Sequence, residues 1–197
     1  MLNKSFAYFA FLYCMFMLLD ILSFNNISSI FKFLFIFSIF LYSQKNTQNT
    51  FIKAALGLTL ISDFFLIFTK YHKTGILFFS AAIIMYIAAF SKNKNLIKYS
   101  VFAAFISALP FIKYPLYSFS IFYGVLFYIN LFLVYKNYFL IYPCLPFAFT
   151  LFAFCDIFVA LYNLTSNEMF YYFIWLFYAP SQYIILHFST KWSPERV

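Results

Sequence analysis

The chain has 197 residues, of which 65% are hydrophobic, 27% are aromatic and only 9% are charged. A soluble domain has about 45–50% apolar residues, so this composition excludes an ordinary soluble protein and predicts an integral membrane protein. The net charge of +8 does not indicate a nucleic-acid partner, because the lysines stand singly between apolar stretches instead of clustering.

Polar interruptions divide the sequence into eight apolar segments, and an α-helix needs about 20 such residues to cross a bilayer. The segments cover about 5–24, 27–43, 51–69, 74–91, 96–112, 115–135, 139–163 and 169–190. The fifth is the least regular, with Lys98 near its start and Pro110 near its end. Strands of a membrane barrel would alternate polar and apolar residues, and these runs do not. The sequence therefore predicts an all-α polytopic helical bundle with eight transmembrane helices in a single domain.

Positive charges are unequally divided between the two sides of such a bundle. Three lysines lie on one side: Lys70, Lys73 and Lys113. Nine basic residues lie on the other side, with the termini: Lys4, Lys45, Lys53, Lys92, Lys94, Lys98, Lys136, Lys191 and Arg196. Lys and Arg are retained on the cytoplasmic side, so we expect both termini in the cytoplasm and a multi-pass protein of the bacterial inner membrane.

Three of the five acidic residues, Asp20, Asp63 and Asp156, fall inside the predicted spans. A charged Asp at a helix centre costs about 2.5–3.5 kcal/mol on insertion scales, so such residues indicate an interior polar site. Asp20 lies near the outer end of its segment, where we expect it to cap or hydrate a helix end. For Asp63 and Asp156 the alternative to function is a carboxylate tied to Lys32 or to a hydroxyl, which would fix helix packing.

Asp63 and Asp156 lie in similar stretches, "LISDFFLIF" and "FAFCDIFVAL", in the third and seventh segments. This spacing is compatible with a four-plus-four internal repeat. Helical spacing also places Ala153, Ala160 and Asn163 on the side of Asp156, which predicts a groove lined by small residues.

Polar-tipped side chains recur along the last segment at helical spacing: Tyr171, Trp175, Tyr178 and Gln182. Gln182 favours a polar interior face, because an amide within a span needs hydrogen-bond partners. Pro180 should kink this helix and free a carbonyl group at the same depth.

No metal motif, phosphate loop, dinucleotide fingerprint or nucleophile elbow is present in the sequence, so we expect neither a metal nor a cofactor. The three cysteines, Cys14, Cys144 and Cys155, form no metal-spaced pair, and we expect them to be buried thiols.

The order of these motifs resembles the YhhN-type membrane proteins, whose members include the lysoplasmalogenases, over most of the chain. "LISDFFLIF" followed by "GILFFSAAIIMYIAAF" is similar to the family's first acidic helix and the helix after it, with Gly75, Phe79 and Tyr86 in place. "LFAFCDIFVAL" is similar to the second acidic helix, with Phe152, Asp156 and Ala160 in place. "FYAPSQYII" is similar to the closing motif and carries Tyr178 and Gln182, and Lys32 in "IFKFLF" is similar to a lysine that the family has before a proline.

The chain departs from the family pattern at four positions: Phe33, Ile83, Ala148 and Cys155. Phe33 replaces the proline, Ala148 a glycine and Cys155 a serine. Ile83 stands where many members have a histidine, three residues before Tyr86, and this difference bears on activity and substrate choice.

The resemblance implies hydrolysis of the vinyl ether bond of a lysophospholipid, with Asp63 and Asp156 as catalytic acid and base. It also implies that Lys32, Tyr86, Tyr178 and Gln182 support the substrate, the water or the two acids. Two alternatives are a lipid-binding family member without catalysis, which Ile83 favours, and a small proton-coupled transporter, because intramembrane acids also form proton relays. The expected partners are membrane lipids, and the oligomeric state is not predicted.

Overall fold

The structure is a computed structural model that describes residues 2–91 and 93–191, with side chains described from residue 5 onward except that of residue 94. This part of the chain forms eight α-helices, one 3-10 turn and no strand. The elements are α1 (Leu2–Ile21), α2 (Asn25–Asn46), α3 (Thr50–Phe68), α4 (His72–Phe90), α5 (Lys94–Ala108), η1 (Leu109–Phe111), α6 (Pro115–Tyr138), α7 (Cys144–Thr165) and α8 (Glu168–Lys191). The prediction of an all-α bundle is confirmed.

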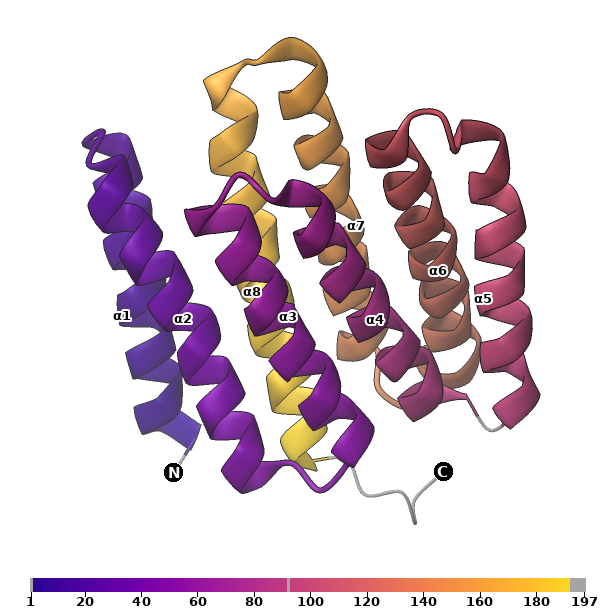
Figure 1. The fold of residues 1–197 in the computed structure, drawn as a ribbon. Helices are drawn as coiled ribbons and strands as arrows, with labels where there is room; N and C mark the ends of the chain where they lie inside the picture. Colours follow the sequence, from indigo (N-terminus) through magenta and orange to yellow (C-terminus); the bar gives the residue numbers. More distant parts are fainter. Residues whose placement is uncertain (1, 92, 192–197) are drawn as a thin grey trace.

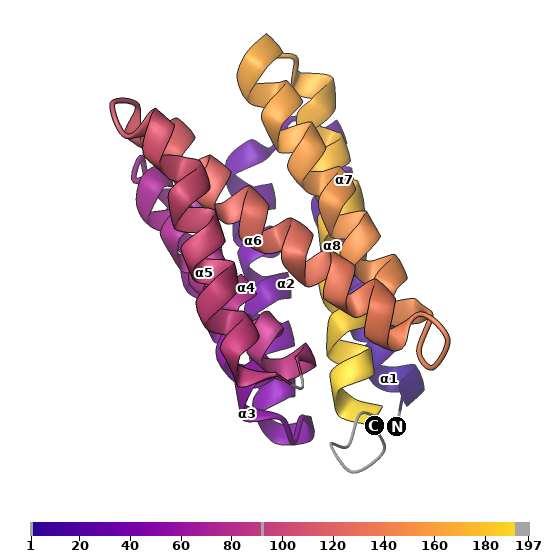
Figure 2. The ribbon, with the colours of Figure 1, turned by 90° about the vertical axis from the view of Figure 1, so that its right-hand side faces the viewer.

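The helices alternate in direction and are joined by short connections, so successive helices pack as antiparallel hairpins (Figures 1 and 2). The α3–α4 and α7–α8 hairpins are the most extensively packed pairs, and α4 also packs along α6. The last helix, α8, contacts α1 and α2 as well as α7 and lies behind the front row of helices in Figure 1. α8 is therefore the element around which the interior is built.

The start of α1 and the end of α8 lie at the same end of the bundle, the lower end in Figure 1. Five of the nine basic residues predicted for this side are described, and all lie in the terminal turns of helices there: Lys45, Lys53, Lys98, Lys136 and Lys191. Lys92 and Arg196 lie outside the described residues, as do the side chains of Lys4 and Lys94. We call this end the terminal end of the bundle.

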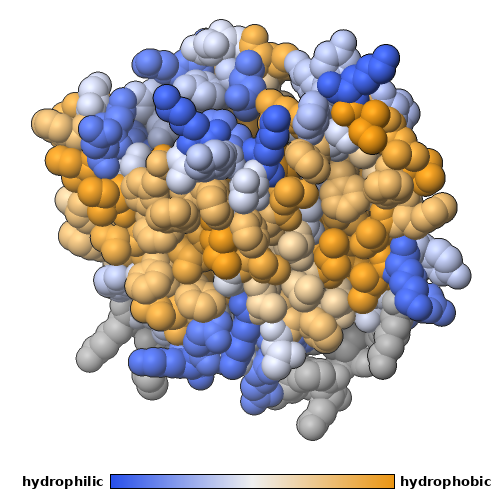
Figure 3. All heavy atoms as spheres, viewed as in Figure 1, coloured by the Kyte–Doolittle hydropathy of each residue, from blue (hydrophilic) through white to orange (hydrophobic). Residues whose placement is uncertain are grey.

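Large apolar side chains cover the outside of the bundle between two polar ends, and form the orange band of Figure 3. Apolar surface on this scale marks contact with a membrane or with another protein. Five helices are long and apolar enough to cross a membrane: α2, α3, α4, α6 and α7. The apolar parts of α1 and α5 are shorter, and α8 has the length but not the hydropathy. These helices suggest a membrane protein, while eight crossings and cytoplasmic termini stay predictions.

Several helix boundaries differ from the predicted segments by three residues or more, and two of these differences have a clear local cause. α1 ends at Ile21, not at 24, because Ser23 adopts a left-handed conformation with φ 63° and the Phe24 amide donates to the Leu19 carbonyl at 2.9 Å. This bonding ends a helix abruptly. α7 begins at Cys144, not at 139, since residues 139–143 form a turn that leads into Pro143.

The cysteine prediction is correct for one residue of three. Cys155 is buried, whereas Cys14 and Cys144 are exposed on the outer faces of their helices. All three are free thiols.

Candidate active site

Asp63 is held in the interior by the tight α3–α4 hairpin. The neighbouring Ser62 hydroxyl donates to the Gly75 carbonyl at 2.6 Å, across the two helices. Gly75 permits this approach, since a Cβ placed there would lie 2.7 Å from side-chain atoms of Leu66 and 3.3 Å from the Ser62 carbonyl oxygen. The hairpin thus fixes Asp63 on the inner face of α3, where its side chain is only 4% exposed.

The Asp63 carboxyl group accepts a hydrogen bond from Tyr178 of α8, with the hydroxyl 2.6 Å from Oδ2. Tyr178 is itself buried, with its ring packed edge-on against Phe79, Phe152 and Trp175. The structure therefore brings together two residues that the sequence predicted as one site.

Asp156 of α7 also accepts a hydrogen bond from a tyrosine, with the Tyr123 hydroxyl of α6 2.8 Å from Oδ2. Its surroundings are more open than those of Asp63. The Asp156 side chain is half-buried, and Ala160 and Asn163, one and two turns further along the same face, are exposed. This face of α7 therefore lies at the surface, and the groove expected along it stays a prediction.

Asp63 and Asp156 share a set of neighbours. The Cys155 thiol and the Tyr123 hydroxyl each lie within electrostatic reach of both carboxyl groups. The Phe79 ring packs against the two tyrosines that donate to the acids, with ring centroids 6.0 Å from Tyr123 and 6.2 Å from Tyr178. No Lys, Arg or His is among the hydrogen-bond or ion-pair partners of either acid in the described part of the chain. We call these residues the acid pair and its tyrosines.

The two tyrosines do not correspond to each other under a four-plus-four repeat. Tyr178 lies in α8 and Tyr123 in α6, whereas a repeat would match α8 with α4 and α6 with α2. The acids occupy equivalent helices, but their hydrogen-bond partners do not.

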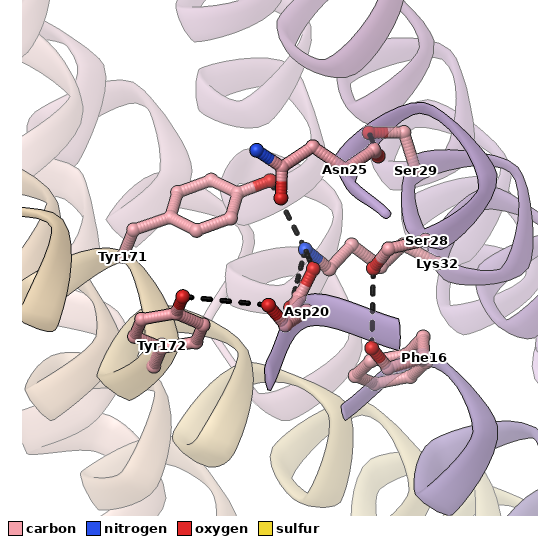
Figure 4. Close-up of polar contacts among 8 residues, drawn as sticks. All are labelled: Phe16, Asp20, Asn25, Ser28, Ser29, Lys32, Tyr171 and Tyr172. Carbon is pink, nitrogen blue, oxygen red and sulfur yellow. Dashed lines mark hydrogen bonds and ion pairs between the residues drawn. The ribbon is translucent and has the colours of Figure 1, made fainter. Parts of the chain in front are cut away.

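The sequence offered Lys32 as a partner for Asp63 or Asp156, but its ammonium group binds a different acid, Asp20. Its Nζ lies 2.7 Å from Oδ2 and 2.9 Å from Oδ1 of Asp20, and both side chains are completely buried (Figure 4). Nζ also donates to the Tyr171 hydroxyl at 3.0 Å and lies 4.3 Å from the centre of the Tyr171 ring and 5.1 Å from that of Trp175. The ammonium group thus donates two hydrogen bonds, to Asp20 Oδ1 and to Tyr171, and lies at ion-pair distance from Asp20 Oδ2.

Asp20 is therefore not the hydrated residue at a helix end that the sequence suggested. The short turn after α1 folds α2 back against it, so that Lys32 reaches Asp20 from the facing helix, and Tyr172 covers the pair by donating to the Asp20 carbonyl at 3.4 Å. Figure 4 shows the side chains from α1, α2 and α8 converging on the ammonium group. We call this arrangement the Asp20–Lys32 pair.

The stripe predicted along α8 faces the interior. Tyr171 and Trp175 contact Lys32, Tyr178 binds Asp63, and Gln182 is fully buried. The stripe connects the Asp20–Lys32 pair to the acid pair, because the Trp175 ring packs edge-on against Tyr178 at 5.4 Å.

Tyr86 and Gln182, two of the predicted supporting residues, contact neither acid directly. Both are fully buried, and neither the Tyr86 hydroxyl nor the Gln182 amide has a hydrogen-bond partner in the described residues. Ile83, at the position where the family resemblance predicts a histidine, is also completely buried.

Sequence reasoning did not identify Tyr123, which donates to Asp156. It also did not identify Thr59 and Asn130, two buried polar side chains without a hydrogen-bond partner in the described residues. Tyr123 is one of 18 tyrosines, and nothing in its local sequence marks it. Asn130 is an amide within a span, and the reasoning that singled out Gln182 applies equally to it. Thr59 lies one turn before Asp63 on α3, and this spacing is the only signal that could have found it.

The described residues contain no group of three His, Cys, Asp or Glu side chains that could hold a metal ion. Comparison with protein-family models, with curated proteins and with solved structures found no match for this chain. The family resemblance therefore rests on the motifs in the sequence.

Proposed function

We propose that the chain is an intramembrane hydrolase that cleaves the vinyl ether bond of lysoplasmalogens, releasing a fatty aldehyde and a glycerophospho headgroup compound. The observation that carries this proposal is the acid pair: two carboxyl groups with shared neighbours, each bound by a tyrosine hydroxyl. Such a pair suits acid–base chemistry, because two carboxyl groups in different surroundings can take different roles, one holding a proton while the other is ionised.

The reaction requires one proton donor, one proton acceptor and one water molecule. A protonated carboxyl transfers its proton to the β-carbon of the vinyl ether, which leaves an oxocarbenium ion at the carbon bound to oxygen. Water adds to this carbon and gives its proton to the carboxylate, and the resulting hemiacetal collapses to the aldehyde and the free alcohol. Asp63 and Asp156 fill the two carboxyl roles, with the assignment of each left open.

The surroundings of the acids support these roles. Tyr178 and Tyr123 orient one oxygen of each carboxyl group and leave the other oxygen available for proton transfer. The aromatic rings around them form an apolar wall, and an oxocarbenium ion near a carboxylate is stabilised most in such a water-poor site. The groove predicted beside Asp156, on the exposed face of α7 that carries Ala160 and Asn163, suits a lipid that enters from the side of the bundle.

The proposal includes the topology that the sequence predicts: eight crossings with both termini in the cytoplasm of a bacterial cell, in its inner membrane. In this topology α3 and α7 run outward, and Asp63 and Asp156 lie in the outer half of the bilayer. Lysophospholipids and other membrane lipids are then the partners in reach of the groove.

Ile83 favours a second candidate, a lipid-binding protein without catalysis. The resemblance predicts a histidine at this position, and the isoleucine is fully buried and cannot carry a proton.

The test is aldehyde release from a lysoplasmalogen by purified protein in detergent. We expect activity from the natural chain and a loss of at least about 100-fold in Asp63→Asn and in Asp156→Asn, the effect typical of removing a general acid or base. Glu168→Gln is the control, since it makes the same chemical change at an exposed position at the start of α8 and should retain full activity.

Three results would oppose the proposal. Folded asparagine variants with full activity would exclude the acid pair as the catalytic residues. Lipid binding without aldehyde release by the natural chain would favour the non-catalytic candidate. Substrate-dependent proton flux in liposomes, again without aldehyde release, would identify a carrier.

A further inference from the structure

Apart from Asp20, whose Oδ2 lies against the Lys32 ammonium group, four buried side chains carry polar atoms without a hydrogen-bond partner in the described residues. They are Thr59, Tyr86, Asn130 and Gln182, and they come from α3, α4, α6 and α8. Each is at most 1% exposed, and the unpartnered atoms include both the oxygen and the nitrogen of the two amides. An unpaired buried polar group costs about 1–3 kcal/mol, so an interior with six such atoms needs a polar occupant.

Two of these side chains lie one helical turn below the acid pair, toward the terminal end. Thr59 precedes Asp63 by four residues and Gln182 follows Tyr178 by four residues. α3 and α8 run in opposite directions, and Asp63 and Tyr178 are level because they are hydrogen-bonded. Thr59 and Gln182 are therefore displaced from them in the same direction, toward the terminal end.

The other two side chains lie at the same depth. α4 and α6 pack side by side in the same direction, and the Asn137 amide donates to the Phe90 carbonyl at 3.2 Å. Asn130 and Ile83 each lie seven residues, two turns, before these partners and are therefore level with each other. Tyr86 lies one turn below Ile83, its side chain directed back along α4. Its hydroxyl is close to that of Thr59 without meeting hydrogen-bond geometry.

Aromatic rings close the region on the terminal side. Phe90, Tyr138 and Phe188 pack edge-on against one another, with ring centroids 5.5–6.2 Å apart. Phe149 forms part of the wall and packs edge-on against Tyr86 at 5.4 Å. On the opposite side lie Asp63 and Tyr178.

We propose that Thr59, Tyr86, Asn130 and Gln182 form an internal hydration site that holds ordered water directly below the acid pair. Two amides and two hydroxyls offer donors and acceptors in nearly equal number, which fits a small neutral ligand that both donates and accepts. A metal ion would want carboxylate, thiolate or imidazole ligands, and an acyl chain would leave the polar atoms unpaired. A buried water satisfies about three polar groups, so two or three molecules account for the set.

The site has a consequence for the reaction, and this step rests on the proposed function. Water held below Asp63 would reach the acid pair from the terminal side, while the lipid enters along the groove beside Asp156. The hydrolytic water and the apolar substrate then approach from different directions and do not compete for one entrance.

The test uses X-ray hydroxyl-radical footprinting of the natural chain in detergent without substrate. Radiolysis turns bound water into radicals that modify the side chains beside it. Phe149 should be modified several-fold faster than Phe35, which is also buried but whose ring packs edge-on against Phe9 and Phe16 of α1. In Asn130→Leu/Gln182→Leu the rate at Phe149 should fall to that of Phe35. Equal rates at Phe149 and Phe35 in the natural chain would overturn the proposal.

Thermal stability gives a second readout that needs no substrate. If water bridges the amides, Asn130→Leu and Gln182→Leu each lower the Tm by several degrees, and the double variant loses less than the sum. If the site is dry, each single variant raises the Tm, because it removes an unpaired group, and this result also overturns the proposal. Asn163→Leu is the control, since this exposed amide bonds within its own helix at 2.8 Å. A protein that passes both tests but releases no aldehyde would refute the hydrolase and leave the hydration site standing.

Discussion

Asp20 and Asp63 are both buried inside the helical bundle, and α8 packs over both. The groups around them differ in charge. Asp20 has the Lys32 ammonium group on both of its oxygens and aromatic rings around the cation. Asp63 has a single tyrosine hydroxyl, and its fellow acid Asp156 has another. The first region pairs its negative charge with a positive one, whereas the second has no cation among its described hydrogen-bond or ion-pair partners.

The contrast separates a packing role from a chemical one. A buried ion pair fixes how helices meet, because each charge is the partner of the other. The acid pair has no cation among its described hydrogen-bond or ion-pair partners, so charge pairing does not account for its place in the interior. The same residue type therefore stabilises the α1–α2 hairpin at one place, and in the proposed function it transfers a proton at the other.

The largest effect is expected from Asp20→Asn. The substitution leaves Lys32 buried with no counter-charge and should lower the free energy of unfolding by about 3–5 kcal/mol. Thermal unfolding in detergent measures this loss as a fall in Tm. The double variant Asp20→Leu/Lys32→Met should recover most of the stability, because it removes both charges and retains the side-chain volume. An unchanged Tm in Asp20→Asn would show that the pair does not hold the hairpin.

The next effect is expected from Gly75→Ala beside the acid pair. The new Cβ would lie 2.7 Å from Leu66 atoms, so α4 must move from α3 and strain the Ser62 hydrogen bond. Overpacking of this kind costs about 1–3 kcal/mol in the free energy of unfolding, measurable as a lower Tm. Gly124→Ala in α6 is the matched control, because no atom lies within 4 Å of its new Cβ, and it should not lower the Tm. Equal Tm values for the two variants would contradict the close α3–α4 contact.

A smaller effect is expected from removing one tyrosine hydroxyl. Tyr178→Phe and Tyr123→Phe each delete the hydrogen bond to one acid, worth about 0.5–1.5 kcal/mol, and should reduce aldehyde release up to about tenfold. Tyr171→Phe deletes a hydroxyl from the Asp20–Lys32 pair, but Lys32 keeps both Asp20 oxygens and the ring beneath it. It should leave the rate of aldehyde release unchanged. A drop in that rate as large as for Tyr178→Phe would remove the distinction between the two regions.

Most of the fold could be predicted from composition and segment length. The eight predicted apolar segments correspond to eight helices in the described residues, although several boundaries differ, as at Ser23 and before Pro143, where the backbone turns for local reasons. The interior face of α8 could also be predicted, because helical spacing alone places Tyr171, Trp175, Tyr178 and Gln182 together.

The partners of the buried charges could not be predicted in the same way. Spacing along one helix does not say which helix faces it, so Lys32 fitted Asp63 and Asp156 as well as Asp20 in the sequence. The tight α1–α2 turn, and the packing of α8 over it, determine that Lys32 binds Asp20. Tyr123 illustrates the same limit, because its role follows only from the contact between α6 and α7.

The smallest effect on stability is expected from Asp63→Asn, which repeats at Asp63 the substitution described for Asp20. It tests the comparison of the two regions most directly. Asp63→Asn has the same chemistry as Asp20→Asn, but no cation depends on Asp63, and an amide oxygen can still accept from Tyr178. If a proton is shared by the acid pair, the change in the free energy of unfolding should stay within about 1 kcal/mol, as expected when a neutral group replaces another of equal size. Thermal unfolding of both variants under one set of conditions gives the comparison directly. A loss at Asp63 as large as at Asp20 would mean that Asp63 is an ionised structural residue, and only Asp156 would then be left to donate the proton.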